Sequence, residues 1–357
     1  MINYEFLYSL LAAPSPSGYE NAAVDVFSHE CMKNGLAFEF SDIIGNCAYS
    51  VGNENGIPFM LSGHIDEIAL QVQHVDENGF VYFIKDGGID PKVLPGSRVR
   101  IISKSGKIVR GIIGKAPIHI EFHTEAKDKV TKMSDLKIDI GAESFKEALS
   151  MIRIGDPIVF EHPYATLGEH RIMSGSIDDK VGVYIVSEVM KRLAKDQGTR
   201  HALQNLKVYG VACTQEEVGG HGATIAAKRI DPKYSIDYDV TFATDDDCVS
   251  KKEWGDIKLG KGGCIAYGPD KDASMCKLMT EVCETNSIPY QPFSVGAGMT
   301  NTLKIKLASS DCATMLLSIP QRNMHTPVEV CDARDIESLI DMTYKYILVL
   351  DERLGKK

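Results

Sequence analysis

The 357-residue sequence has no long apolar run and no block of basic residues. No segment approaches the roughly 18–20 consecutive apolar residues that a transmembrane helix needs, so we expect no membrane partner. The chain carries 39 basic and 49 acidic residues, which gives a net charge of −10. An acidic chain without a basic patch is a poor ligand for polyanions, and we therefore expect no nucleic-acid partner.

The sequence also lacks paired cysteines. Its nine cysteines are scattered, and none forms a CxxC pair. An odd number of isolated cysteines is typical of reduced, packed thiols rather than of a disulfide framework. The first twenty residues carry Glu5 within their apolar stretch and no basic segment, unlike a secretory signal peptide. The sequence therefore predicts a cytoplasmic protein.

Helical and strand patterns alternate over most of the chain. Near the N-terminus, the spacing of apolar residues predicts helices over 2–12 and 20–33 and a buried strand over 57–62. Further helices are expected over 181–195, 221–228, 273–285 and 333–354, and strands over 206–214, 238–243 and 316–319. Such alternation is typical of an α/β domain.

A different pattern interrupts this alternation between residues 68 and 165. Short alternating runs separated by turn dipeptides predict strands over 69–75, 80–84, 98–102, 108–113 and 157–160. The sequence thus predicts a β-barrel-like domain, residues 68–165, inserted into a catalytic α/β domain made of residues 1–67 and 166–357.

Metal-binding residue types stand at the predicted strand ends and loops of the α/β domain. They are His64 after the first strand, Asp178 at a helix start, Glu217 after the strand over 206–214, Asp239 at the start of the next strand, and His325 after the strand over 316–319. Ligands of open α/β sheets gather at the carboxyl ends of the strands. Each residue also has a simpler explanation, such as a polar turn, a helix cap or a solvated loop.

Taken together, two histidines and three carboxylates are typical of a pair of divalent metals that share one bridging carboxylate. Such a pair lowers the pKa of a bound water to about 7. Glu216 stands beside Glu217 and is left over as the natural general base.

At these residues the sequence resembles the tetrahedral dinuclear metallo-aminopeptidases, the family of glutamyl and lysyl aminopeptidases, of which some members are misnamed endoglucanases. The resemblance covers nearly the whole chain. It is carried by the motifs at 14–20 (PSPSGYE), 63–67 (GHIDE), 94–96 (LPG), 177–180 (IDDK), 215–219 (QEEVG), 239–241 (DVT), 258–262 (KLGKG) and 324–330 (MHTPVEV).

The resemblance implies a mixed-sheet α/β/α fold of the zinc-exopeptidase type and a role for each site residue. One metal is held by His64, Asp178 and Asp239, and the other by Asp178, Glu217 and His325. Asp66 orients His64, and Glu216 takes a proton from the water that attacks the peptide carbonyl. Zinc is the expected metal, with cobalt or manganese as alternatives.

The resemblance also implies partners. The substrates are peptides with a free N-terminal amine, and the inserted domain forms dimers that assemble into a tetrahedral dodecamer. One departure is Asn301, which replaces the acid of the family's Gly-Gly-Thr-Asp-Ala motif and could alter the pocket or a support of the site. The preferred N-terminal residue stays open, although the acidic run 245–247 would suit basic substrates if it lined the pocket.

Two other functions compete with this one. A related zinc-dependent deacylase or dipeptidase would use the same dinuclear chemistry, and a requirement for a free amine would separate it from an aminopeptidase. A non-catalytic peptide-binding relative would have lost a ligand or the base, whereas all six positions are present.

Overall fold

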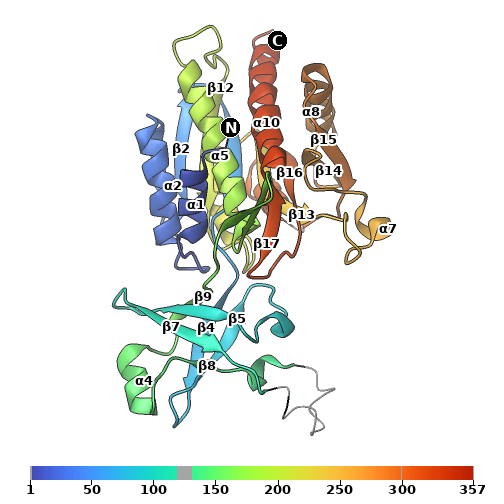
Figure 1. The fold of residues 1–357 in the computed structure, drawn as a ribbon. Helices are drawn as coiled ribbons and strands as arrows, with labels where there is room; N and C mark the ends of the chain where they lie inside the picture. The colour runs from blue at the N-terminus through green and yellow to red at the C-terminus, as the bar shows by residue number, and fades with distance from the viewer. Residues whose placement is uncertain (1, 118, 120–130, 299, 357) are drawn as a thin grey trace.

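The computed structural model describes residues 2–117, 119, 131–298 and 300–356. A layered α/β part and a closed β-barrel have separate hydrophobic cores (Figure 1). The predicted fold class, a mixed-sheet α/β/α architecture with a barrel-like insertion, is confirmed.

The layered part is built on an eight-stranded sheet in the order β1-β2-β12-β3-β13-β16-β14-β15. Its strands are β1 (Ala37–Ser41), β2 (Cys47–Gly52), β3 (Ile57–His64), β12 (Leu206–Cys213), β13 (Tyr234–Phe242), β14 (Gly263–Tyr267), β15 (Tyr290–Ser294) and β16 (Ala313–Gln321). The four central strands, β12, β3, β13 and β16, run parallel, so their carboxyl ends meet at one edge. Strands β2 and β14 run antiparallel to their neighbours β12 and β16.

Helices cover both faces of this sheet. The larger core lies under α1 (Tyr4–Ala12), α2 (Asn21–Lys33), α5 (Ile177–Asp196), α8 (Ala273–Asn286) and α10 (Ala333–Leu354). The opposite face is covered by α6 (His221–Ile230) and α9 (Asn301–Ala308). Strand β3 shows the division, since Phe59 and Leu61 join the first core and Met60 the second. Adjacent side chains of a strand point to opposite faces, which is why one apolar run serves two cores.

The barrel closes in the order β4-β5-β8-β7-β6-β9. Its strands are β4 (Ala69–Val75), β5 (Val81–Asp86), β6 (Arg98–Ile102), β7 (Ile108–Ile113), β8 (Ile138–Asp139) and β9 (Pro157–Phe160). Helix α4 (Phe145–Met151) and the 3-10 turns η1 (Pro91–Val93) and η3 (Met133–Asp135) lie between strands. The strands expected here are confirmed, whereas α4 and the two-residue β8 were not predicted.

A three-stranded sheet, β10-β11-β17, lies outside the main sheet. It consists of β10 (Ala165–Leu167), β11 (Arg171–Ser174) and β17 (Glu329–Asp332), and the short helix α7 (Lys251–Trp254) follows β13. One predicted boundary was wrong: β13 begins at Tyr234 rather than at 238, so Asp239 lies well inside the strand. Within the described ranges, no helix combines the length and apolar character needed to cross a bilayer.

Candidate metal centre and active site

The candidate site lies at the carboxyl ends of the central parallel strands, at the edge of the sheet that faces the barrel (Figure 1). His64 is the last residue of β3, and it pairs in register with Cys213 at the end of β12. The chain that leaves β12 therefore places Glu216 and Glu217 beside His64. Both glutamates line the same pocket as His64, as the sequence predicted.

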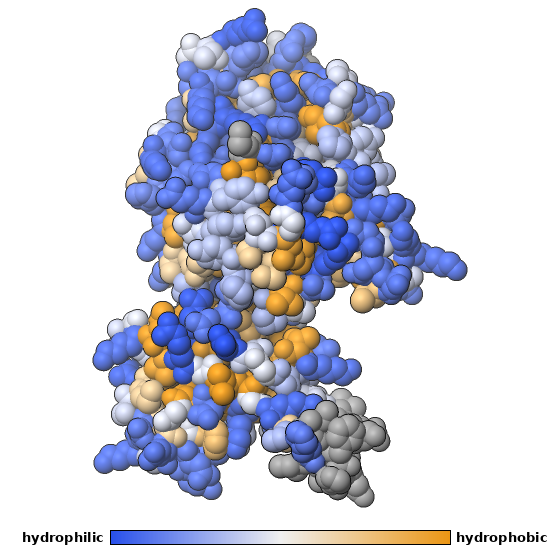
Figure 2. Space-filling model, viewed as in Figure 1, coloured by the Kyte–Doolittle hydropathy of each residue, from blue (hydrophilic) through white to orange (hydrophobic). Residues whose placement is uncertain are grey.

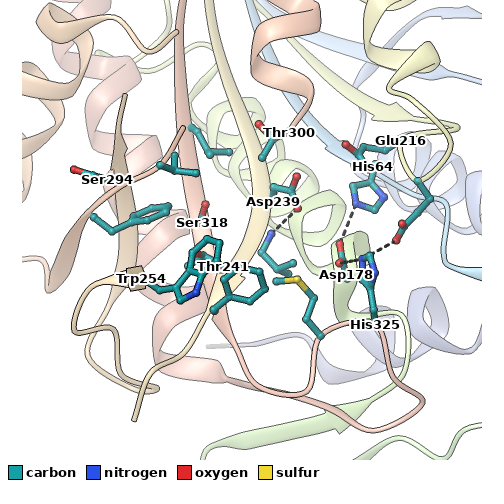
Figure 3. Close-up of a pocket in the computed structure, with 17 residues that line it drawn as sticks. His64, Asp178, Glu216, Asp239, Thr241, Trp254, Ser294, Thr300, Ser318 and His325 are labelled. Atoms are coloured by element: carbon teal, nitrogen blue, oxygen red, sulfur yellow. Dashed lines mark hydrogen bonds and ion pairs between the residues drawn. The ribbon is translucent and has the colours of Figure 1, made fainter. Parts of the chain in front are cut away.

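Asp178 lies at the centre of this group (Figure 3). The residue stands in the first turn of α5, where its backbone is not helical (φ −72°, ψ 111°). Its two carboxylate oxygens face different histidines: Oδ1 lies 3.0 Å from His64 Nε2, and Oδ2 lies 3.3 Å from His325 Nε2. A carboxylate with one oxygen toward each histidine has the geometry of a bridging ligand.

Five of the predicted site residues come together around Asp178 in two overlapping sets. In each set the potential ligand atoms lie within 4.8 Å of one another; the sets are His64, Asp178 and Asp239, and Asp178, Glu217 and His325. These are the two ligand triads that the family resemblance implied. Asp239 reaches the first set from within β13, three residues before the strand ends at Phe242.

The remaining nitrogens of both histidines are engaged in a way that suits metal binding. His64 Nδ1 lies 3.1 Å from the Asp66 carbonyl oxygen and 3.4 Å from Asp66 Oδ1. His325 Nδ1 lies 2.7 Å from the carbonyl oxygen of Gly88, a barrel residue. Metal-binding histidines usually donate their second N–H to a carboxylate or a carbonyl, which leaves Nε2 free as the ligand.

The electrostatics of the centre also call for a cation. Burial raises the pKa of Asp239 well above its usual value, and the negative charge of Asp178 raises it further. Burial and Asp178 likewise raise the pKa of Glu217 to about 8. The buried Oε1 of Glu217 has no hydrogen-bond partner, and such an oxygen is costly to bury unless it binds a cation. The donor set therefore fits two divalent metals such as zinc.

Asp66 supports both sides of the centre. Besides its contact with His64, its carboxylate accepts the backbone N–H of Glu216 at 2.9 Å and that of Glu217 at 3.1 Å. The Ser17 hydroxyl, from the turn after α1, donates to Asp66 Oδ2 at 2.7 Å. Although burial disfavours its charge, these donors and His64 lower the pKa of Asp66. Asp66 thus contacts His64 and also holds the turn that carries the two glutamates.

Glu216 belongs to neither ligand set but lines the pocket beside them. Burial raises its pKa, and the negative charges of Asp66 and Asp178 act in the same direction. The Glu216 carboxylate thus lies close to both sets without belonging to either.

Two supporting acids escaped the sequence analysis. Glu329 in β17 accepts the backbone N–H of Asp178 at 3.2 Å and that of His325 at 3.0 Å, so it links two of the candidate ligands. Glu67 accepts a hydrogen bond from the fully buried Lys180 at 3.0 Å. Both acids lie within the quoted motifs, GHIDE and MHTPVEV, but their partners are far away in the sequence.

Two further expectations concern the substrate pocket. The acidic run 245–247 is absent from the described pocket lining, and Asp245 instead pairs with Arg322 at 2.8 Å. Asn301 does not line the pocket either; it is buried at the start of α9, and neither of its amide atoms has a hydrogen-bond partner. A Cβ on Gly220 would lie 3.0 Å from Asn301 Oδ1, so Asn301 packs behind the turn that carries Glu216. The altered residue therefore bears on a support of the site.

Comparison with known proteins decides the family. A family model described as M42 glutamyl aminopeptidase matches residues 45–342. The chain belongs to this family. A lysyl aminopeptidase from Pyrococcus furiosus is 31% identical over 350 residues, with 96% of each chain covered.

Solved structures of TET peptidases agree with this fold over nearly the whole length. A TET aminopeptidase from a marine sediment Thaumarchaeota archaeon has a TM-score of 0.90 at 28% identity, and the match covers 98% of this chain and 97% of that one. TET1 peptidase of Pyrococcus horikoshii has a TM-score of 0.84 at 30% identity, with 96% and 98% covered. The M42 protein is therefore a metal-dependent aminopeptidase, and the resemblance found in the sequence is confirmed.

Proposed function

We propose that this M42 enzyme removes N-terminal residues from peptides with two divalent metals, zinc in the native enzyme, held by the two ligand sets around Asp178. The observation that carries the proposal is the placement of the two Asp178 oxygens, each opposite a different histidine. When bound, the metals supply Lewis-acid polarisation of the peptide carbonyl and make water a better nucleophile near neutral pH.

The protein's own groups move the proton. The Glu216 carboxylate accepts a proton from the attacking water as the new C–O bond forms. It then donates that proton to the departing amine nitrogen as the C–N bond breaks. Its raised pKa suits a group that must both take and return a proton near neutrality.

The position of the pocket explains why only the first residue would be removed. The pocket runs from the carboxylate cluster to an apolar wall (Figure 3). Asp239 lies between the His64–Asp178 pair and the apolar wall, and acidic side chains at this end of the pocket would hold the substrate's α-ammonium group. An acylated N-terminus lacks that charge and adds bulk at the same place.

We further propose that residues 1–67 and 166–357 form the catalytic domain and that residues 68–165 form a dimerisation domain. The separate core of the barrel supports this division. Exposed apolar side chains on the barrel and α4 support its role in assembly: Ile84, Ile108, Ile112, Phe145, Leu149, Met151 and Ile154. Apolar patches on this part of the surface are visible in Figure 2.

The assembly proposed is the tetrahedral dodecamer. TET1 peptidase of Pyrococcus horikoshii is described as forming a tetrahedron or a larger octahedral shell. A dodecamer of this 39.2 kDa chain has a mass of roughly 470 kDa, twelve times the chain, which light scattering distinguishes from a dimer. A reducing compartment, the cytoplasm, is proposed because all nine cysteines are free and all but Cys248 are buried.

The decisive experiment uses metal-reconstituted protein and paired substrates. Leucine 4-nitroanilide and its N-acetyl derivative differ only at the amine, and a tripeptide with and without an N-acetyl group repeats the comparison. Hydrolysis of the free-amine compounds alone, abolished by a chelator and restored by zinc, supports the proposal. Equal release of 4-nitroaniline from the acetylated compound would show that no free amine is needed, and release of acetate from it would assign the enzyme to the deacylases instead.

A further inference from the structure

The pocket next to the metal centre differs sharply between its two ends. Its cavity has a volume of about 260 Å³. Among the described residues that line it, every ionisable group belongs to the metal centre or is Glu216. The other end is formed by aromatic and aliphatic side chains together with serine and threonine hydroxyls.

The apolar end is largely preformed. Phe242 and Trp254 pack edge to face, with ring centroids 4.7 Å apart and an interplanar angle of 75°. Leu316 and Phe293, which also line the pocket, are exposed by only 1% and 8% and belong to a small core of their own. Side chains held in this way leave a fixed apolar surface that a ligand can cover without reordering the protein.

Several charged residues in the surrounding loops pair with each other outside the pocket. Asp245 pairs with Arg322 at 2.8 Å. Asp256, just after α7, accepts from Lys251 at 2.9 Å and from Lys258 at 3.2 Å.

The same holds for the buried loop after β14. There Lys271 binds Asp270 at 2.6 Å, and both side chains are almost fully buried. A substrate ammonium or carboxylate at the apolar end would therefore meet no opposite charge from the described lining, and burying an unpaired charge is strongly unfavourable.

From this division we infer that the enzyme prefers large apolar N-terminal residues, such as leucine, methionine and phenylalanine, over lysine and glutamate. The inference rests on the proposed function, because it assumes that the α-amine is held at the carboxylate end. It separates this chain from the activities in the names of two relatives, the lysyl aminopeptidase of Pyrococcus furiosus and the glutamyl aminopeptidase of Lactococcus lactis.

A series of aminoacyl 4-nitroanilides with one leaving group tests the preference. We expect kcat/KM for leucine, methionine and phenylalanine to exceed that for lysine and glutamate by at least about 10-fold. Alanine should fall below leucine by at least as much, because each methylene in an apolar pocket contributes roughly 10- to 200-fold. A lysine or glutamate substrate that equals leucine overturns the inference, whereas inactivity toward every compound would refute the proposed function.

A binding measurement gives a readout that does not depend on turnover. Trp254 is the only tryptophan in the chain, so tryptophan fluorescence reports on this pocket alone. Free leucine and phenylalanine should change the emission in a saturable way in the zinc-loaded protein. Lysine and glutamate should leave it unchanged at the same concentrations, and an equal response to all four amino acids contradicts the inference.

A substitution at the rim of the pocket tests directly whether the lack of charge at the apolar end sets the preference. Ser294 is exposed and lines the apolar end, so an acidic side chain is tolerated there. Ser294→Asp should raise the ratio of lysine to leucine kcat/KM by about 10-fold, while Ser294→Asn should leave it unchanged. An unchanged ratio in Ser294→Asp would show that the substrate side chain lies elsewhere.

The aromatic pair Phe242 and Trp254, which forms one wall of the apolar end, offers a second variant. Trp254→Ala should lower kcat/KM for phenylalanine at least about 10-fold, mainly through KM, and should affect alanine less. Phe38, 59% exposed at the opposite edge of the sheet, provides the matched control, and Phe38→Ala should change neither substrate. An equal loss for phenylalanine and alanine in Trp254→Ala would contradict an apolar subsite at this wall.

Discussion

The barrel contributes directly to the candidate metal centre through Gly88. Replacing this glycine should weaken the binding of only one of the two metals. A Cβ at position 88 would lie 2.7 Å from His325 Nδ1, whereas the ordinary van der Waals distance from a Cβ to a neighbouring atom is 3.4–4 Å. The imidazole must therefore retreat by about 0.7 Å, the difference between 3.4 and 2.7 Å. Gly88 has no positive φ, so alanine adds the methyl group without straining the backbone.

The displacement disturbs the 2.7 Å hydrogen bond from His325 to the Gly88 carbonyl and shifts Nε2 from its position 3.3 Å from Asp178 Oδ2. Loss of such a supporting contact typically weakens metal binding by 10- to 100-fold, or about 1.4–2.8 kcal/mol. Calorimetric titration of metal-free protein with zinc should show two binding steps in the wild type. In Gly88→Ala we expect the step that involves His325 to weaken by this factor and the His64 step to stay unchanged.

Gly114 provides the matched control in the same barrel. A Cβ there meets nothing within 4 Å, and its φ is not positive, so Gly114→Ala should bind both metals normally. Equal zinc affinity in Gly88→Ala and wild type would refute the argument that the barrel holds a ligand in place. Equal weakening of both steps would show a general loss of structure instead.

Three further predictions follow from the same contacts. Glu216→Gln should retain two metals but lose roughly 10²- to 10⁴-fold in kcat, and near-normal turnover would refute its role as base. Lys180→Met should lower the urea-measured free energy of unfolding by about 3–5 kcal/mol, because it removes the buried ammonium group that pairs with the Glu67 carboxylate. The double variant with Glu67→Gln should recover part of the loss, and a loss below about 1 kcal/mol would contradict the argument. Zinc binding at pH 7 should release protons, and the zinc affinity should rise with pH. The reason is that burial raises the pKa of Glu217 to about 8, while carboxylate neighbours outweigh burial and raise the pKa of His325 to about 9. Calorimetry in buffers of different ionisation enthalpy checks this, and the absence of proton release would contradict it.

Local patterns in the sequence predicted the elements that carry the site. The apolar run that ends at His64 and the strand before Glu216 were both found, because a buried parallel strand leaves a short, continuous apolar signature. The barrel strands were found from their alternation and turn dipeptides. The start of β13 was misplaced because Asp237 and Asp239 lie inside it, and acidic residues normally argue against a strand interior.

Contacts between distant segments could not be predicted in the same way. In the sequence, Gly88 appeared only as part of a predicted turn. In the structure its carbonyl oxygen accepts a hydrogen bond from His325, 237 residues further along the chain. Glu329 likewise binds Asp178 across 151 residues. Neither contact has a local signature, because it depends on how the barrel and β17 pack against the end of the main sheet.

Anomalous diffraction from zinc-soaked crystals would show whether Asp178 bridges two metals. We expect two anomalous peaks per chain about 3.5–4 Å apart, one beside His64 and Asp239 and the other beside Glu217 and His325, with Asp178 between them. A single peak, or two peaks that do not share Asp178, would contradict this bridging role.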